Sequence, residues 1–184
     1  MPGETRARMI EATVAALQRQ GVAGMSFTDI LRDSGAARGA IYHHFPDGKT
    51  QLVAEAAARN AQDVRGHLAQ LPTGSPQETV KAFLAAIRPV VAASATGGGC
   101  AVAAVTIGED AGLRQVAADA FHSWTGQLAE RLGTAGLSGD AATDLAVTLI
   151  TLLEGAHVLC RAAGGIEPFD RAARTALHLL PGSA

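Results

Sequence analysis

Five side chains in the first third of the chain carry groups that bind nucleic acid. They are Arg38, Tyr42, His43, His44 and Lys49. Arginine binds the edges of guanine bases, and lysine, tyrosine and histidine bind phosphate oxygens. Gly39 and Ala40 lie among them, and such small residues allow a helix to approach DNA closely. We therefore expect residues 38–49 to contact DNA.

Other chemistries fit the same residues less well. Adjacent histidines point in different directions on a helix, and His43 and His44 have no partner four residues away on the same helical face, so we expect no metal site. A phosphate-binding loop around Gly48 would need a glycine five residues earlier, where His43 stands. The carboxylates of the chain form no persuasive acid–base pair, and no Ser-His-Asp order emerges. We expect neither catalysis nor a cofactor.

The composition indicates a globular helical protein. The 184 residues include 15 basic and 17 acidic side chains, and 48% are hydrophobic, which excludes disorder. Alanine is abundant and runs of β-branched residues are few, which favours helices. Two cysteines exclude a disulfide scaffold. The charged N-terminus has no signal peptide and no apolar stretch reaches about 18 residues, so we expect a cytoplasmic protein without a transmembrane helix.

The sequence therefore predicts an all-α protein with about nine helices in two domains. The predicted domains are residues 1–48, which hold the nucleic-acid-binding residues, and residues 49–184. Residues 100–108 suit a buried strand or a helix, and we predict a helix because no partner strand is visible. The predicted helices span residues 4–20, 28–34, 38–44, 49–71, 77–94, 100–108, 110–133, 140–163 and 168–180.

Residues 26–45, SFTDILRDSGAARGAIYHHF, have the pattern of a helix-turn-helix. Two short helices are joined at Gly35, and in this motif the second helix enters the major groove of DNA. We expect Thr28 to cap the first helix and to offer its hydroxyl to a phosphate. Arg6 and Arg8 are equally consistent with DNA contacts and with solvated charges. The predicted DNA-binding residues are Ser26, Thr28, Ala37, Arg38, Gly39, Ala40, Tyr42, His43, His44 and Lys49.

The stretch from Thr5 to Glu55 resembles the TetR family of bacterial transcriptional repressors. The resemblance rests on RARMIEATVAALQRQGVAGMSFTDI, on SGAARGAIYHHF and on GKTQL. The segments FPDGK and GGGCAVAAVTI are similar to the LmrA/YxaF-like subgroup. Two positions depart from the family pattern. Ala37 replaces the usual Ser, Thr or Pro at the start of the second motif helix and cannot cap it, and Ala40 replaces Ser or Thr, so we expect base recognition to depend heavily on Arg38.

The resemblance implies a homodimer that joins through its last two helices and a ligand cavity enclosed by the fourth to seventh helices. The apolar residues of 140–163 form two stripes, so this helix must be buried on two faces. The predicted interface consists of Leu145, Leu149, Leu152, Leu153, Ala156, Leu159, Ala173, Ala176, Leu177 and Leu180. Candidate cavity residues, for which core packing is the alternative, are Asn60, Val64, His67, Phe83, Ile87, Cys100, Thr106, Phe121, Trp124 and His157.

Together these features predict a repressor that binds a palindromic operator as a dimer and is released by a small, largely apolar ligand. An activator is one alternative. A helical binding or catalytic protein that merely keeps this architecture is another, and such a protein would need no exposed arginine at position 38. Salt dependence of binding to the upstream DNA of the gene distinguishes specific from nonspecific binding.

Overall fold

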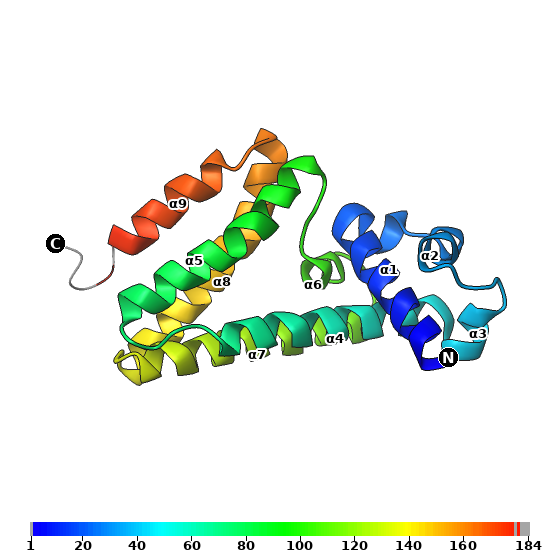
Figure 1. The fold of residues 1–184 in the computed structure, drawn as a ribbon, viewed down its shortest axis with the longest axis horizontal. Helices are drawn as coiled ribbons and strands as arrows, with labels where there is room; N and C mark the ends of the chain where they lie inside the picture. The colour runs from blue at the N-terminus through cyan, green and yellow to red at the C-terminus, as the bar shows by residue number, and fades with distance from the viewer. Residues whose placement is uncertain (1, 179, 181–184) are drawn as a thin grey trace. The chain divides into compact units, whose positions relative to one another are not determined.

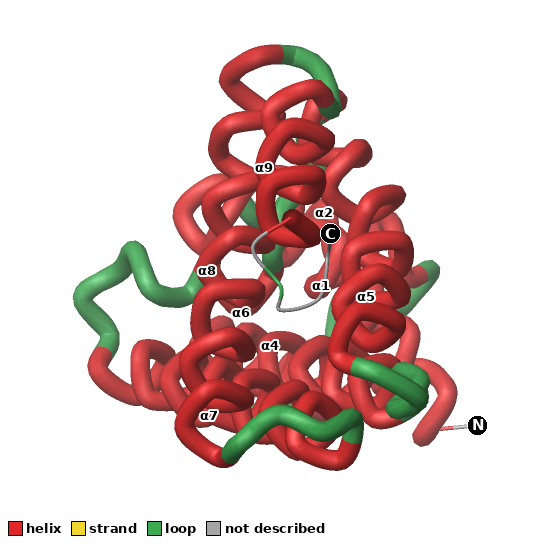
Figure 2. Tube along the Cα trace, turned by 90° about the vertical axis from the view of Figure 1, so that its left-hand side faces the viewer, coloured by secondary structure: helices red, strands yellow, loops and turns green. Residues whose placement is uncertain are grey.

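The computed structural model describes residues 2–178 and 180, and this part of the chain is helical with no strand (Figure 2). The all-α prediction with nine α-helices is confirmed, and a short 3-10 helix, η1, is added (Figure 1). Residues 100–108 begin as a helix, as predicted, but only for one turn. The helices are α1 (Pro2–Gly24), α2 (Phe27–Ser34), α3 (Ala40–His44), α4 (Gly48–Ala69), α5 (Pro76–Ala92), η1 (Ala93–Thr96), α6 (Ala101–Ala104), α7 (Ala111–Thr134), α8 (Gly139–Ala163) and α9 (Glu167–His178).

The chain divides into two compact units. Unit 1 comprises Met1–Gln62 and Cys100–Ala120, and unit 2 comprises Asp63–Gly99 and Phe121–Ala184. This division differs from the predicted boundary at residue 48, because the N-terminal part of α4 and residues 100–120 pack with the first three helices. A local pattern does not reveal that residues 100–120 join an N-terminal core.

Unit 1 is built on α1, which packs against α2 and α6. Met9 and Leu17 of α1 are fully buried, as is Ile30 of α2. The sequence predicts that glycines end α1 near residue 20, but the helix resumes beyond Gly21 and runs to Gly24. Gly21 itself has a non-helical backbone with φ 67°, a conformation that glycine adopts without strain. The glycine therefore kinks α1 instead of ending it.

Unit 2 is organised around α8, which packs against α5, η1 and α9. Its core contains large, fully buried side chains from several helices, including Phe83, Trp124, Leu149 and Phe169. Pro89 lies inside α5, and the helix continues for one turn before tightening into η1. The bidentate ion pair of Arg88 with Asp170 joins α5 to α9, with both N···O distances at 3.0 Å.

Two segments of unit 2, Pro76–Thr96 and Gly139–Ala163, are long and apolar enough by composition to cross a membrane. The sequence predicts no transmembrane helix, because charged residues and glycines interrupt both segments. In the structure α5 and α8 contact each other. One apolar face of each helix is buried within unit 2, as shown by Phe83 of α5 and Leu149 of α8. The core helices of a helical protein have the same length and composition.

Candidate nucleic-acid interface

A serine cap fixes the start of α2. The Ser26 hydroxyl accepts a hydrogen bond from the amide of Asp29 over 3.2 Å and donates one to the Asp29 carboxylate over 2.7 Å. The hydrogen bond from the Ser26 hydroxyl to the Asp29 carboxylate is the largest of the interactions that lower the pKa of Asp29 below its ordinary value. The positive charge of Arg32 lowers this pKa further. The prediction that Thr28 caps the helix was wrong. The spacing Ser26-x-x-Asp29 resembles a capping box and is the signal that identifies the cap.

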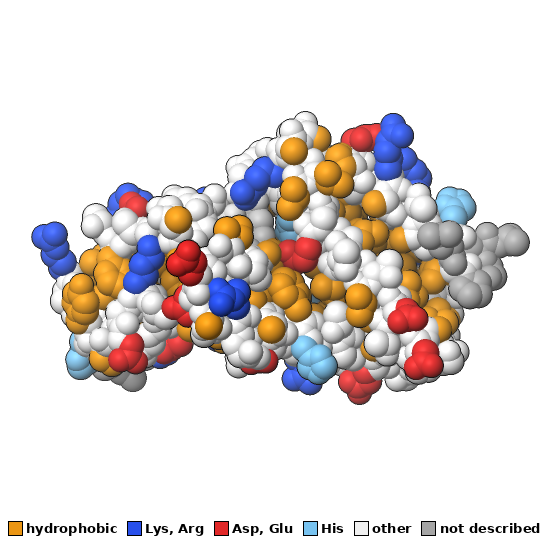
Figure 3. Space-filling model, turned by 180° about the vertical axis from the view of Figure 1, so that it is seen from behind, with side chains coloured by type: hydrophobic (Ala, Val, Ile, Leu, Met, Phe, Trp, Pro, Cys, Tyr) orange, Lys and Arg blue, Asp and Glu red, His pale blue; other side chains and the backbone are white. Residues whose placement is uncertain are grey.

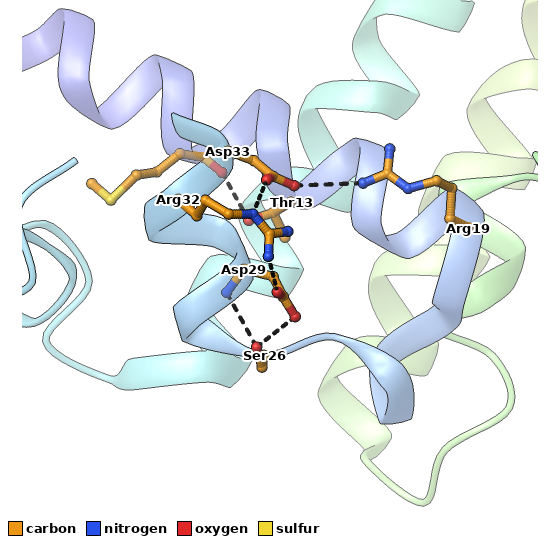
Figure 4. A network of polar contacts seen from close by, with 7 residues as sticks. Thr13, Arg19, Ser26, Asp29, Arg32 and Asp33 are labelled. Atoms are coloured by element: carbon orange, nitrogen blue, oxygen red, sulfur yellow. Dashed lines mark hydrogen bonds and ion pairs between the residues drawn. The ribbon is translucent and has the colours of Figure 1, made fainter. Parts of the chain in front are cut away.

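A network of charged side chains holds α2 against α1 (Figure 4). Arg32 pairs with Asp29 over 2.8 Å and with Asp33 over 2.9 Å, and Arg19 of α1 lies 3.7 Å from Asp33. Arg8 of α1 donates from Nε to the carbonyl of Ser34 over 2.9 Å. This bond satisfies a carbonyl at the C-terminal end of α2. The C-terminal end of α2 is therefore joined to α1 by two side chains, those of Arg8 and Arg19.

The second motif helix is shorter than predicted. It begins at Ala40, whereas the sequence predicts a start near Arg38. Gly39 occupies the N-cap position without a side-chain hydrogen bond, and the amide of Ala40 binds the carbonyl of Ala37 over 2.9 Å. Because neither Ala37 nor Gly39 offers a capping side chain, residues 37–39 form a turn before the helix. Arg38 therefore lies on this turn and is exposed.

Burial sets the orientation of α3. Ile41 and Phe45 lie one turn apart and are both buried. The intervening Tyr42 and His43 are exposed, and 65% of the Tyr42 surface is accessible. The ring of Tyr42 meets Phe27 of α2 edge to face, with centroids 6.0 Å apart. Tyr42 therefore contacts α2 through its ring while most of its surface remains accessible.

The end of α3 is also tied to α1 and α4. Arg6 of α1 forms an ion pair with Glu55 of α4, and its guanidinium lies 5.0 Å from the ring centroid of Phe45. Glu55 in turn accepts a hydrogen bond from Gln51 over 3.0 Å. The sequence left Arg6 open between DNA contact and solvated charge, and the structure gives it a supporting role inside unit 1. No local sequence signal reveals a contact over this separation.

The two cations predicted to reach DNA differ in their surroundings. Arg38 has no hydrogen bond or ion pair with the described residues, so its guanidinium is available to a ligand. The Nζ atom of Lys49 donates to the carbonyl of Met25 over 2.9 Å. An ammonium group has three donors, so this bond leaves Lys49 able to bind a phosphate as well.

All ten predicted DNA-binding residues lie in unit 1, between the start of α2 and the start of α4. Their side chains are exposed or half-buried. The exposed ones are Ser26, Thr28, Ala37, Arg38, Gly39, Tyr42 and His43, and the half-buried ones are Ala40, His44 and Lys49.

Comparison with known proteins assigns both parts of the chain. Residues 9–56 match the family of bacterial regulatory proteins called the tetR family, and residues 76–175 match the C-terminal domain of LmrA/YxaF-like transcriptional regulators. The chain belongs to the TetR family. It is a DNA-binding transcriptional regulator of this family, and its resemblance to the LmrA/YxaF-like subgroup is confirmed.

Two curated relatives match this TetR-family regulator over nearly its whole length. An uncharacterised HTH-type transcriptional regulator of Mycobacterium tuberculosis strain H37Rv is 30% identical over 183 residues, which cover 95% of this chain and 93% of the relative. The HTH-type transcriptional regulator LmrA of Bacillus subtilis strain 168 is 28% identical over 171 residues, covering 90% and 91%.

A solved structure shares the fold. A cysteine mutant of the TetR family transcriptional regulator CifR, complexed with 26-base-pair double-strand operator DNA, superposes with a TM-score of 0.72. The two chains are 20% identical, and the match covers 94% of this chain and 95% of CifR.

The predicted dimer residues of this TetR-family regulator divide into buried and accessible ones. Leu149, Leu153 and Ala156 of α8, together with Leu180, are buried within the chain. The other six are accessible to differing degrees: Leu159 is exposed, and Leu145, Leu152, Ala173, Ala176 and Leu177 are half-buried.

Further apolar side chains on α8 extend its accessible face. Val147 and Val158 are exposed. Figure 3 shows apolar side chains on one face of the molecule, interspersed with acidic, basic and histidine side chains. The helix therefore presents one apolar face to its own core and another to solvent.

The candidate cavity residues fall in both units. Asn60, Cys100 and Thr106 belong to unit 1, and the other seven belong to unit 2. Within unit 2, Phe121 and Trp124 meet edge to face with centroids 5.2 Å apart. Buried members are Phe83, Ile87, Trp124 and His157, half-buried members are Asn60, Val64, Cys100 and Phe121, and exposed members are His67 and Thr106.

His157 is the buried ionisable member of the candidate cavity set. Its Nδ1 atom lies 2.7 Å from the hydroxyl of Ser94. Burial lowers the pKa of His157, and the charge of Arg161 lowers it further. Among the described residues, no group of three or more His, Cys, Asp or Glu side chains is arranged to hold a metal ion.

Proposed function

We propose that this TetR-family regulator represses transcription as a homodimer whose two copies of α3 bind a palindromic operator, and that a small, largely apolar ligand releases it. In this proposal residues 1–48 form the DNA-binding domain, residues 49–184 form the ligand-binding and dimerisation domain, and the protein acts in the cytoplasm. The observation that carries the proposal is the outward face formed by the turn at Arg38 and by Tyr42.

Three properties of this face support DNA binding. Arg38 is exposed and unpaired within the described residues, as base recognition requires. Gly39 adds no side chain that would hold the backbone away from the groove, and Tyr42 is braced by Phe27. A rigid side chain loses less conformational entropy when it binds than a mobile one does. The solved operator complex of CifR, which has the same fold, supports the choice of partner.

The start of α2 supplies the proposed phosphate contacts. The exposed Thr28 hydroxyl lies in the first turn of α2, where unpaired amides and the helix dipole favour an anion. Lys49 retains donors for a second phosphate. These contacts set the register on the duplex, while sequence preference comes from Arg38 and from the short side chains beside it.

The accessible apolar face of α8 supports the homodimer. Val158 and Leu159 are 68% and 58% exposed, and such side chains on a helix are typical of a surface that a partner covers. Because Leu149 and Leu153 are buried within the chain, the proposed interface on α8 centres on Leu159 with Leu152 and Leu145, joined by α9.

The effector class follows from the candidate cavity residues that are buried in unit 2. Phe83, Ile87 and Trp124 are apolar over most of their surface, which favours a largely apolar ligand. Release from DNA requires the ligand to bind one conformation better than another, and the operator must then weaken ligand binding by the same factor.

Operator affinity of Arg38→Ala and Tyr42→Ala tests the proposed DNA contacts. Footprinting on the upstream region of the protein's own gene first identifies the operator, and fluorescence anisotropy then measures its affinity. We expect Arg38→Ala to weaken operator binding by about tenfold and to relax base preference at one position in each half-site. Arg65→Met, which removes an exposed charge from α4 in unit 2, is the control. Unchanged affinity in both DNA-face variants would reject this face as the operator-binding surface.

A further inference from the structure

The segment that leads out of unit 2 is held by side chains of α8. The chain passes from unit 2 to unit 1 between Gly99 and Cys100. Before that point, Ser94 of η1 and His157 of α8 are both buried, and the Ser94 hydroxyl lies 2.7 Å from Nδ1 of His157. Arg161 lies one turn further along α8, and its Nη2 atom donates to the carbonyl of Gly97 over 2.9 Å and to that of Gly98. Thus α8 binds this segment near both of its ends.

The backbone of the same segment is closely packed. The amide of Gly98 donates to the carbonyl of Ala93 over 2.8 Å. A Cβ atom at Gly98 would lie 2.8 Å from that carbonyl oxygen, so only glycine fits there. Gly97 has φ 102°, in the left-handed region. Although the sequence contains three consecutive glycines, Ala93–Gly98 therefore follows one defined path.

Directly after this segment the chain enters α6, which packs against α1 within unit 1. In unit 1, α1 also supplies Arg8, which binds the end of α2, and Arg6, which contacts Phe45 after α3. The chain thus runs from the segment that contacts α8, through Cys100, into α6. That helix packs against α1, which contacts the end of α2 and Phe45.

We propose that Ser94, His157 and Arg161 are positioning residues for operator binding, which fix the path of Ala93–Gly98 and thereby the entry of the chain into α6. This inference rests on the proposed function. The neutral imidazole suits the role, because burial and then the charge of Arg161 lower the pKa of His157, so that it remains a hydrogen-bond partner for Ser94 at neutral pH.

Releasing this segment lowers operator affinity without touching DNA. A segment free to adopt several paths spends only a fraction of its time in the path that suits operator binding, and the apparent Kd rises as the inverse of that fraction. The effect reaches the operator through the chain, so it differs from loss of a DNA contact. It also differs from a general loss of stability, which lowers the melting temperature but leaves the affinity of the folded protein unchanged.

Arg161→Met and Ser94→Ala test the inference in the full-length protein. Arg161 is exposed, so its substitution leaves the core of unit 2 intact. Arg65→Met is the matched control, and Arg161→Lys, which keeps one donor, is the conservative variant. Measurements on each variant are operator Kd by fluorescence anisotropy, melting temperature, and hydrogen exchange at the amides of Gly97 and Gly98.

The expected result is an operator Kd about tenfold higher for Arg161→Met and Ser94→Ala than for Arg65→Met, with faster exchange at Gly97 and Gly98 and partial rescue by Arg161→Lys. Faster exchange with an operator Kd within about twofold of the control would overturn the inference, because the contacts would then be purely structural. Failure of the unsubstituted protein to bind any upstream duplex would overturn the proposed function, and this inference with it.

Discussion

Substitutions at Ser26 and Thr28 separate helix capping from DNA contact. The two residues lie at the same end of α2, and both belong to the predicted DNA-binding set. In the structure the Ser26 hydroxyl accepts from the amide of Asp29, whereas the exposed Thr28 hydroxyl makes no hydrogen bond with the described residues. We therefore expect Ser26→Ala to lower stability and Thr28→Ala to lower operator affinity.

The cap sets the size of the first effect. Removing an N-cap hydroxyl costs about 1 kcal/mol, because it leaves the amide of Asp29 without its partner. In a chain of this length that loss lowers the melting temperature by about 2–4 °C. Thr28→Ala removes no hydrogen bond within the described residues, so its effect on unfolding stays within about 0.5 kcal/mol. Loss of one phosphate contact by Thr28→Ala weakens operator binding by about fivefold.

Urea denaturation followed by circular dichroism, together with operator titration by fluorescence anisotropy, measures both quantities on the same preparations. Ser26→Thr is the control, since threonine also caps helices and should retain most of the stability. Equal destabilisation by Thr28→Ala and Ser26→Ala would refute the assignment of the cap. Unchanged operator affinity in Thr28→Ala would remove Thr28 from the DNA-binding set.

Three further substitutions test unit 2. The pKa of His157 in the folded state lies below its value in the unfolded state. The stability that this histidine contributes is therefore present above about pH 6.5 and is lost as pH falls through the folded-state pKa. The melting temperatures at pH 7.5 and 5.5 should differ more for the unsubstituted protein than for His157→Asn. Gly98→Ala should destabilise the protein by about 1–3 kcal/mol, because its Cβ meets the carbonyl of Ala93, whereas Gly108→Ala, with open space around it, should not; equal urea midpoints would contradict this. Leu159→Arg should convert a dimer to a monomer in sedimentation velocity, because it places a charge on the exposed apolar face of α8, and a persistent dimer would exclude that face as the interface.

Periodicity, composition and the spacing of residues in the sequence determined the helical class and the location of the helix-turn-helix. Apolar residues at helical spacing identified the helices, and within the motif Ile41 and Phe45 lie one turn apart and are both buried. The stretch from Thr5 to Glu55 also carried the resemblance that the comparisons confirm. These properties are local, because the spacing of side chains along one helix fixes which of them share a face.

The sequence pattern predicted the first residue of each motif helix less well, because that residue depends on the hydrogen bonds of the individual capping side chain. Ser26 rather than Thr28 caps α2, and α3 begins after a turn because residues 37–39 lack a capping side chain. Both Ser26 and Thr28 carry a hydroxyl that can cap a helix, and only the spacing of Ser26 to Asp29 favours Ser26 in the sequence. The extended backbone of Ser26 and its hydrogen bond from the amide of Asp29 establish the choice in the structure.

Only the tertiary structure decided which distant residues support each other. Arg6 meets Glu55 and Phe45, and Ser94 meets His157, over long separations in the chain. The face of α8 that remains accessible also depended on packing, because both of its apolar stripes look alike in the sequence. Local patterns show that a side chain must be buried or paired. Which distant residue becomes the partner of such a side chain depends on how the whole chain folds. The interaction energy of two groups depends on the distance between them, and a local sequence pattern does not contain that distance.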